Sequence, residues 1–236
     1  MLEHLIPALR AHFSSHTKSR KPLVISFHGT PGTGKNYVAD LIAETLYEKG
    51  VKSKYVHKYL GRADFPKAAN ADLYKAQINH EVRVAIADCP RSLFIFDEVD
   101  KMPEGVFESL TSLVGYNSQI DGNDFSDAIF IFLTNTAGVQ ISDHLGDIIK
   151  QGTLRENAKL GQFESVLAKA AYNQIGGLRK ASLIETHVID HYLPFLPLEK
   201  QHVYLCILEE FKRWNVHHPK PATVEYVFCF ILSLVL

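Results

Sequence analysis

The 236-residue sequence has no excess of charge of either sign and no long apolar segment. It contains 25 lysine and arginine residues against 26 aspartate and glutamate residues, so its formal net charge is −1. It therefore lacks the basic character of proteins that bind nucleic acid, and no such partner is expected. No apolar run reaches the roughly 20 residues that a membrane-spanning helix needs. Hydrophobic residues make up 46% and charged residues 22% of the chain, which is typical of a globular protein.

Cysteine is scarce. Cys89, Cys206 and Cys229 are far apart, show no Cys-x-x-Cys spacing and cannot all pair with one another within the chain. We therefore expect buried or unreactive thiols. The sequence also contains no Asn-x-Ser/Thr acceptor for N-glycosylation.

Both ends of the sequence differ from targeting or anchoring segments. Residues 1–13 form an amphipathic pattern interrupted by Glu3, His4 and Arg10, whereas a signal peptide needs a positively charged start and an unbroken apolar stretch. Residues 227–236 are almost wholly apolar but too few to span a bilayer. We interpret them as a buried segment or as an end at which the natural chain has been replaced.

Apolar runs and helical periodicity alternate along the first part of the chain. Such runs are typical of parallel strands that helices cover on both faces, and the alternation predicts an α/β fold. Helical periodicity takes over after about residue 136. We therefore predict an α/β domain at residues 1–178 and a small helical lid at residues 179–236. The predicted strands are 23–27, 54–60, 92–96 and 128–134. A first helix is predicted to end at Gly50, and further helices are predicted at 72–87, 104–114, 162–173 and 198–214.

The strongest functional signal is the segment GTPGTGKN at residues 29–36, between the strand at 23–27 and a helix that ends at Gly50. A strand, a glycine-rich loop, a lysine and a helix in this order are typical of a phosphate-binding P-loop. Glycine lets the backbone curl so that successive N–H groups face an anion, and the helix start adds its positive dipole end. The lysine ammonium lies against the β- and γ-phosphates of ATP. The residues expected to bind the nucleotide are Gly29, Thr30, Pro31, Gly32, Thr33, Gly34, Lys35 and Asn36.

Asn36 stands where most P-loops have serine or threonine, whose hydroxyl binds Mg²⁺. A carboxamide oxygen is also a hard oxygen ligand that Mg²⁺ accepts, directly or through water. We therefore expect Mg²⁺ binding to persist, with Asn36 as a direct or water-mediated ligand.

The strand at 92–96 leads into two adjacent carboxylates, Asp97 and Glu98, which is the Walker B arrangement. In this arrangement Asp97 would hold Mg²⁺ or its water shell, and Glu98 would polarise the attacking water as general base. Asp100 is a third nearby acid, and we expect it to cap the next helix or to face a neighbouring subunit.

Asn135 directly follows the strand at 128–134. A polar amide at the carboxyl end of a strand points into the crevice in which α/β proteins bind ligands. Asn135 could hydrogen-bond the γ-phosphate or orient the water, a role called sensor 1, or it could be an ordinary turn residue.

Together these motifs are typical of a P-loop ATPase of the AAA+ class, and the sequence closely resembles the torsins from roughly residue 20 to residue 220. The presence of asparagine at position 36 is itself in keeping with that family. The resemblance implies a parallel AAA+ sheet flanked by helices and followed by a small helical lid. The stretches that carry it are SFHGTPGTGKNYVADLIAETLYEKG at 26–50, RSLFIFDEVDKM at 91–102, IFIFLTN at 129–135 and SLIETHVIDHYLPFLPLEKQHVYLC at 182–206.

The resemblance implies an ATP- and Mg²⁺-dependent ATPase of the endoplasmic reticulum lumen and nuclear envelope that forms a homo-oligomer and remodels a protein or membrane substrate. Torsins have no arginine finger of their own, and a membrane-anchored lumenal activator of the lamina-associated polypeptide type supplies one. No arginine stands in an obvious finger position here, with Arg155 and Arg179 as the nearest candidates. Cys206 falls where the family has one half of a redox-sensitive pair, and Cys89 where it has a cysteine before the Walker B strand.

The sequence departs from the torsin pattern at both ends. We expect it to lack the signal sequence, the membrane-interacting stretch and the segment packing against the nucleotide base with which torsins begin. It also shows no Gly-Cys-Lys sensor 2, and Cys229 does not sit in such a motif. We interpret these departures as the result of truncation, alternative splicing or an imperfect gene prediction.

Three functions remain open from the sequence. The first is a torsin-like ATPase that couples ATP hydrolysis to remodelling. The second is a P-loop small-molecule kinase, against which the missing acceptor-binding chemistry argues. The third is a scaffold that binds partners without turnover.

Overall fold

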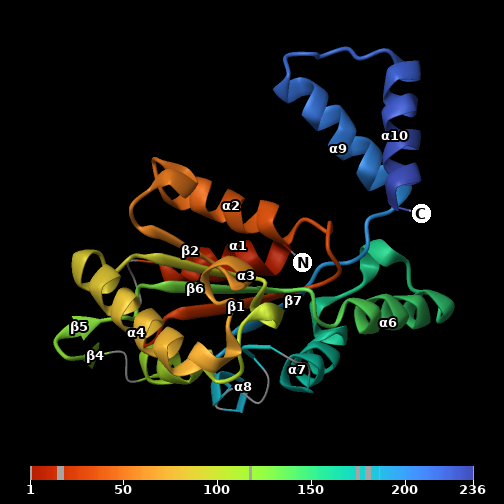
Figure 1. Ribbon diagram of the computed structural model, residues 1–236. Helices are drawn as coiled ribbons and strands as arrows, with labels where there is room; N and C mark the ends of the chain where they lie inside the picture. The colour runs from red at the N-terminus through yellow and green to blue at the C-terminus, as the bar shows by residue number, and fades with distance from the viewer. Residues whose placement is uncertain are drawn as a thin grey trace. The chain divides into compact units, whose positions relative to one another are not determined.

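The computed structural model describes residues 2–14, 19–116, 119–173, 176–178, 182–185 and 187–235. The chain divides into two compact units, residues 1–196 and residues 197–236. Figure 1 shows the helices and strands of each unit.

A sheet of five parallel strands forms the centre of the first unit, in the order β2-β3-β6-β1-β7 (Figure 1). Every residue of β1 and of β6 is buried, which explains why these strands are continuous apolar runs in the sequence. The predicted α/β fold with a parallel sheet is therefore confirmed. The strands are β1 Leu23–His28, β2 Val56–Leu60, β3 Leu93–Asp97, β6 Ile129–Thr134 and β7 His191–Pro194.

Helices cover both faces of this sheet. The helices α1 Leu2–His12 and α2 Lys35–Leu46 contribute to the hydrophobic core on one face. The long helix α4 Ala71–Asp88 contributes to the core on the other face. The other α-helices and strands in the described part of the unit are α3 Gly61–Asp64, α5 Thr111–Val114, β4 Gln119–Ile120, β5 Asn123–Asp124, α6 Gly138–Lys150, α7 Glu164–Asn173 and α8 Ser182–Glu185.

Alternating side chains of β3 and β6 divide between the two cores. Phe94 and Phe96 of β3 lie in the core that contains α4, directly opposite Phe130 and Phe132 of β6. The rings stack with centroids 4.8 Å and 5.4 Å apart. The isoleucine at position 95 lies in the core that contains α1 and α2. This packing fixes β3 and β6 against each other, and with them the segments that follow their carboxyl ends.

The fifth strand, β7, was not predicted from the sequence. It has only four residues and ends in Pro194, which cannot donate to a sheet ladder and is tolerated at an edge. Because β7 belongs to the sheet, the boundary along the chain between the two compact units lies between Leu196 and Pro197. The boundary predicted from the sequence lies after residue 178. The predicted helix at 104–114 consists of a 3₁₀ turn at Val106–Leu110 followed by α5.

The second unit consists of α9 Lys200–Arg213 and α10 Pro221–Val235. Its core is formed by Ile207, Val224 and Phe228. A helix buries only the face that meets its neighbour, so Phe230 of α10 stays exposed. The expected burial of the terminal segment thus holds for Phe228 and not for Phe230, and the side chains of residues 231–236 lie outside the described part of the chain.

Of the two alternatives expected for the cysteines, buried or unreactive thiols, burial does not hold for Cys206 and Cys229. Cys206 and Cys229 are exposed and Cys89 is partly buried, and all three are free thiols. Of the helices in the described ranges, none has the length and apolar character needed to cross a membrane.

Candidate functional site

The loop between β1 and α2 depends on glycine at three positions. Gly32 and Gly34 adopt φ angles of +76° and +93°, which residues with a Cβ atom rarely adopt. Gly29 is required for a steric reason, because a Cβ atom there would lie 2.5 Å from the backbone oxygen of Phe195. The loop thus curls at the carboxyl end of β1 and passes close to the residue that follows β7.

Lys35 is the first residue of α2 and lies inside this loop, with only 7% of its surface exposed. Its ammonium Nζ donates hydrogen bonds to the carbonyl oxygens of Gly29 at 2.7 Å and Thr30 at 2.9 Å. It also donates to Oδ1 of Asn135 at 3.0 Å. Lys35 therefore links the loop to the segment that follows β6.

The charge of Lys35 is subject to opposing effects. Burial lowers the pKa of its ammonium, and the nearby carboxylates of Asp97 and Asp100 offset part of that shift. A further anion at the loop would favour the charged form of Lys35.

Asn36 and Asp97 face each other where α2 begins and β3 ends. Asn36 Nδ2 donates to Asp97 Oδ2 at 2.7 Å, and the backbone N–H of Glu98 donates to Asp97 Oδ1 at 2.8 Å. A carboxylate oxygen and a carboxamide oxygen are hard donors that suit Mg²⁺. Within the described residues, no group of three or more His, Cys, Asp or Glu side chains could hold a metal. The pair fits Mg²⁺ nonetheless, since this ion usually takes one or two protein oxygens together with phosphates and water.

Glu98 has a left-handed backbone conformation, with φ of +53°, which is uncommon for a residue with a Cβ atom. Its Oε2 lies 3.6 Å from Nε of Arg62, which is in α3. Gly61 packs so closely against the carbonyl of Glu98 that a Cβ atom would collide with it. Arg62 was not predicted from the sequence, because its contact with Glu98 joins positions that are 36 residues apart.

Asn135 follows β6, which lies between β1 and β3 in the sheet. This strand order places Asn135 between the loop and the end of β3. Its backbone N–H donates to Oδ1 of Asp100 at 3.1 Å. The Asp100 side chain is only 8% exposed, so it points inward, and the expectation that it caps a helix or faces a neighbouring subunit is wrong.

A single cleft of about 420 Å³ brings together residues from the loop, α2, β3 and the end of β6. Thr33 is among the candidate residues that do not line it, and its hydroxyl instead donates to the carbonyl of Thr30 at 2.8 Å. Tyr37 lines the cleft and was not predicted. The lining residues are Pro31, Gly32, Gly34, Lys35, Asn36, Tyr37, Asp97, Glu98 and Asn135.

Of the two candidate finger arginines, the structure describes Arg155. Arg155 begins a 3₁₀ turn at Arg155–Asn157 and is not a lining residue. Arg179 lies outside the described residues.

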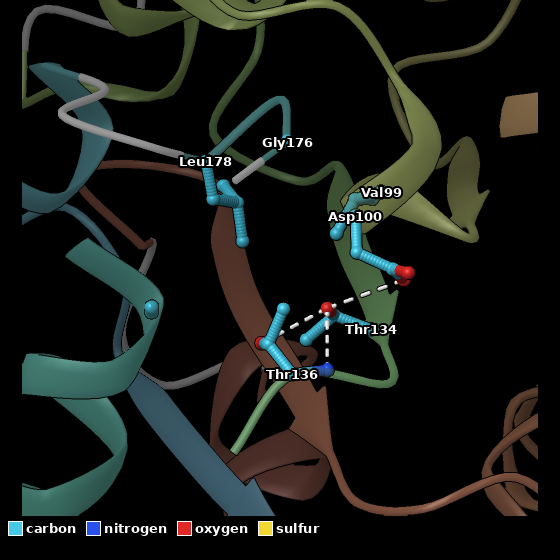
Figure 2. Close-up of a pocket in the computed structure, with 7 residues that line it drawn as sticks. Val99, Asp100, Thr134, Thr136, Gly176 and Leu178 are labelled. Carbon is cyan, nitrogen blue, oxygen red and sulfur yellow. Dashed lines mark hydrogen bonds between the residues drawn. The ribbon is translucent and has the colours of Figure 1, made fainter. Parts of the chain in front are cut away.

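Buried polar side chains connect the elements behind the cleft. His28, the last residue of β1, is fully buried, and burial together with the Lys35 charge lowers its pKa to about 3, so its ring is neutral. Its ring nitrogens lie 2.8 Å from the hydroxyl of Ser26 and 3.4 Å from that of Thr136. Figure 2 shows the continuation, with the Thr134 hydroxyl between Thr136 and Asp100.

Comparison of the sequence with known proteins finds torsins and torsin-like proteins. The family model described as Torsin matches residues 1–96. A torsin-like protein of Drosophila melanogaster is 59% identical over 231 residues, covering 98% of this chain and 68% of its own length. A torsin-like protein of Caenorhabditis elegans is 38% identical over 203 residues, covering 86% of this chain and 57% of its own length.

Among solved structures, this fold is similar to that of the AAA+ protein Hsp104 in its closed state with ATPγS and FITC-casein. The TM-score is 0.57 at 14% sequence identity, and the match covers 94% of this chain and 36% of the Hsp104 chain. At this identity the likeness shows a shared fold.

Proposed function

The chain belongs to the torsin family and has the AAA+ fold, and from this premise we propose that it binds MgATP in the cleft and hydrolyses it. The observation that carries the proposal is the convergence of Lys35, Asp97, Glu98 and Asn135 on one cleft. These residues come from three chain segments, and together they supply the positive charge, the metal ligand, the base and the polar amide that phosphoryl transfer to water needs.

The loop would bind the phosphates. Lys35 can exchange the carbonyl oxygens of Gly29 and Thr30 for phosphate oxygens, since all of these are acceptors for its ammonium. The N-terminal end of α2 adds its dipole to the same site. Asp97 and Asn36 would hold Mg²⁺, and the ion would supply positive charge to the phosphate oxygens.

Glu98 would accept the proton of the attacking water as general base. Glu98 directly follows β3 and lines the same cleft as the loop. Asn135 would contact the γ-phosphate, because its amide already lies 3.0 Å from the Lys35 ammonium.

We further propose that the chain acts in the endoplasmic reticulum lumen or nuclear envelope as a homo-oligomer that remodels a protein or membrane substrate. Torsin membership supports this proposal. The chain spans 57% of the length of the worm relative and 68% of that of the fly relative, so these whole-protein properties are carried over from the family.

A lumenal activator of the lamina-associated polypeptide type would supply the arginine finger. In support, the described residues that line the cleft include Lys35 as a cation but no arginine. Torsin membership also favours hydrolysis over phosphate transfer to a small molecule.

The test is MgATP binding by the purified chain and by Lys35→Ala. Loss of the ammonium removes a charge-assisted contact of about 1.5–3 kcal/mol, so we expect affinity to fall roughly 10- to 100-fold. Fluorescent nucleotide titration measures it, and Lys49→Ala, an exposed lysine that does not line the cleft, is the control. If the folded chain binds no MgATP, the proposal is wrong and a scaffold function is favoured.

A further inference from the structure

We propose that Asp100 is a positioning residue that fixes Asn135 against Lys35 and thereby sets how strongly the cleft prefers ATP to ADP. This inference rests on the proposed nucleotide function. Asp100 does not line the cleft, and its hydrogen-bonded link to the cleft runs through Asn135.

The backbone of Asn135 lies just beyond the sheet. The pairing of β6 with β1 ends at Thr134, so the ladder does not orient the next residue. Oδ1 of Asp100 provides the acceptor for the Asn135 N–H at 3.1 Å and lies 3.5 Å from the Thr134 hydroxyl. Because the Asn135 side chain meets Lys35 at 3.0 Å, the Asp100 carboxylate determines where that amide points.

The turn after β6 is fixed internally as well. The Thr134 hydroxyl donates to the Thr136 hydroxyl at 3.0 Å and accepts the Thr136 N–H at 3.1 Å (Figure 2). The Thr136 hydroxyl lies 3.4 Å from Nδ1 of His28, directly before the phosphate-binding loop. Asp100 therefore anchors one end of a buried polar chain whose other end supports that loop.

Asp100 has little freedom to move. A Cβ atom at Gly176 would lie 2.6 Å from the Asp100 Cα, and the Gly177 N–H donates to the Val99 carbonyl at 2.8 Å. The remaining cavity of about 10 Å³ is bordered by Val99, Asp100, Thr134 and Leu178 among others, and it has room for one water molecule at most (Figure 2). The other oxygen, Oδ2, pairs with Lys101 at 3.0 Å.

ADP lacks the phosphate that Asn135 would contact, so displacement of Asn135 weakens ATP binding selectively. For Asp100→Ala we expect affinity for ATP to fall by about tenfold, the value of one hydrogen bond to a charged group. Affinity for ADP should stay within about twofold of the wild-type value. Asp100→Asn retains an oxygen that can accept the Asn135 N–H, so it should restore the ATP-to-ADP ratio. Competition against a fluorescent nucleotide, with MgATP and MgADP measured separately, gives both affinities.

Asp190→Ala is the matched control. Asp190 Oδ2 also accepts a strand N–H, that of Val24 at 2.9 Å, and pairs with Lys21 at 2.6 Å, but at the amino ends of the strands. Its loss should lower thermal stability and leave the ATP-to-ADP ratio unchanged.

A wild-type ratio in folded Asp100→Ala, or an equal fall of the ratio in Asp190→Ala, would overturn the inference. If Asp100→Ala does not fold, the ratio of ATP to ADP affinity is measured in Asp100→Glu instead. We expect the ratio to fall there as well, because the added methylene displaces the carboxylate oxygen from the Asn135 N–H. A wild-type ratio in that variant would likewise overturn it. Wild-type protein that binds neither nucleotide would instead contradict the proposed function.

Discussion

At the residue scale, the cleft is organised around the Lys35 ammonium. Its three oxygen partners lie 2.7–3.0 Å away, and two of them are carbonyls of the loop itself. Burial lowers the pKa of Lys35, which means that its charged form is less favourable there than in water. A phosphate in the loop would reverse part of that effect, so anion binding and the charge of Lys35 support each other.

Glu98→Gln should separate ATP binding from ATP turnover. Glutamine has nearly the same shape as glutamate but cannot take a proton from water, so we expect turnover to fall by about 10²- to 10⁴-fold. Affinity for MgATP should stay within about twofold, because Lys35 and Asp97 are unchanged. Nucleotide titration and phosphate release, with activator where it is required, measure the two quantities.

Glu48→Gln is a suitable control for that variant, because Glu48 is exposed and lies outside the cleft. Loss of MgATP binding by folded Glu98→Gln, or turnover equal to that of the control, would show that Glu98 is not the base.

At the scale of elements, the site is made by the ends of strands rather than by their middles. β1 leads into the loop, β3 into Asp97 and Glu98, and β6 into Asn135. Because the strands are parallel and adjacent in the order β3-β6-β1, these three ends lie along one edge of the sheet. The close approach of Gly29 to Phe195 adds the end of β7 to the same edge.

Gly29→Ala should damage the site through this contact between elements. Its Cβ atom would meet the Phe195 carbonyl at 2.5 Å and force the loop or β7 to shift. We expect a loss of about 1–3 kcal/mol in the free energy of unfolding, together with weaker MgATP binding. Denaturant titration and nucleotide titration measure these effects.

Gly146→Ala in α6 is the matched control, because nothing lies within 4 Å of its Cβ position. Alanine there should raise stability by roughly 0.5–1 kcal/mol. Gly29→Ala with wild-type stability and affinity would mean that the loop and β7 can separate without cost.

At the scale of the whole molecule, buried histidines make the first unit sensitive to acid. The pKa of His28 is lowered to about 3 by burial, with the Lys35 charge as a smaller contribution. Burial also lowers the pKa of His12, His57 and His191, against partial opposition from nearby acids. All four shifts favour the neutral ring in the folded chain.

Stability should therefore decrease as the pH falls below about 6.5. The unfolded chain binds protons at its histidines below that value while the folded chain does not, so the histidine contribution is present above pH 6.5. For His28 it is lost progressively down to about pH 3. His28 alone should account for roughly 1.4 kcal/mol per pH unit. Free energies of unfolding at pH 7.5, 6.5 and 5.5 measure this dependence.

His28→Gln should reduce that slope, whereas His217→Gln, at an exposed position, should leave it unchanged. Equal stability of the wild-type chain at pH 7.5 and 5.5 would contradict the assignment of neutral buried histidines.

The sequence by itself determined the parallel α/β sheet and the residues that line most of the cleft. Those features are local: apolar runs mark buried strands, glycines mark the loop, and Lys35, Asp97 and Asn135 each stand directly next to a recognisable strand or helix end. Only the tertiary structure decided the order of the strands, the presence of β7 in the sheet and the division of the chain into two units after Leu196.

The roles of Arg62 and Asp100 also came only from the fold. Arg62 meets Glu98, and Asp100 meets the backbone of Asn135, across 36 and 35 positions of sequence respectively. Neither pair has a local pattern, because which strand ends become neighbours depends on how the whole sheet is ordered. The sequence thus determined which groups stand at the ends of the strands, and the packing of the sheet decided which of them meet.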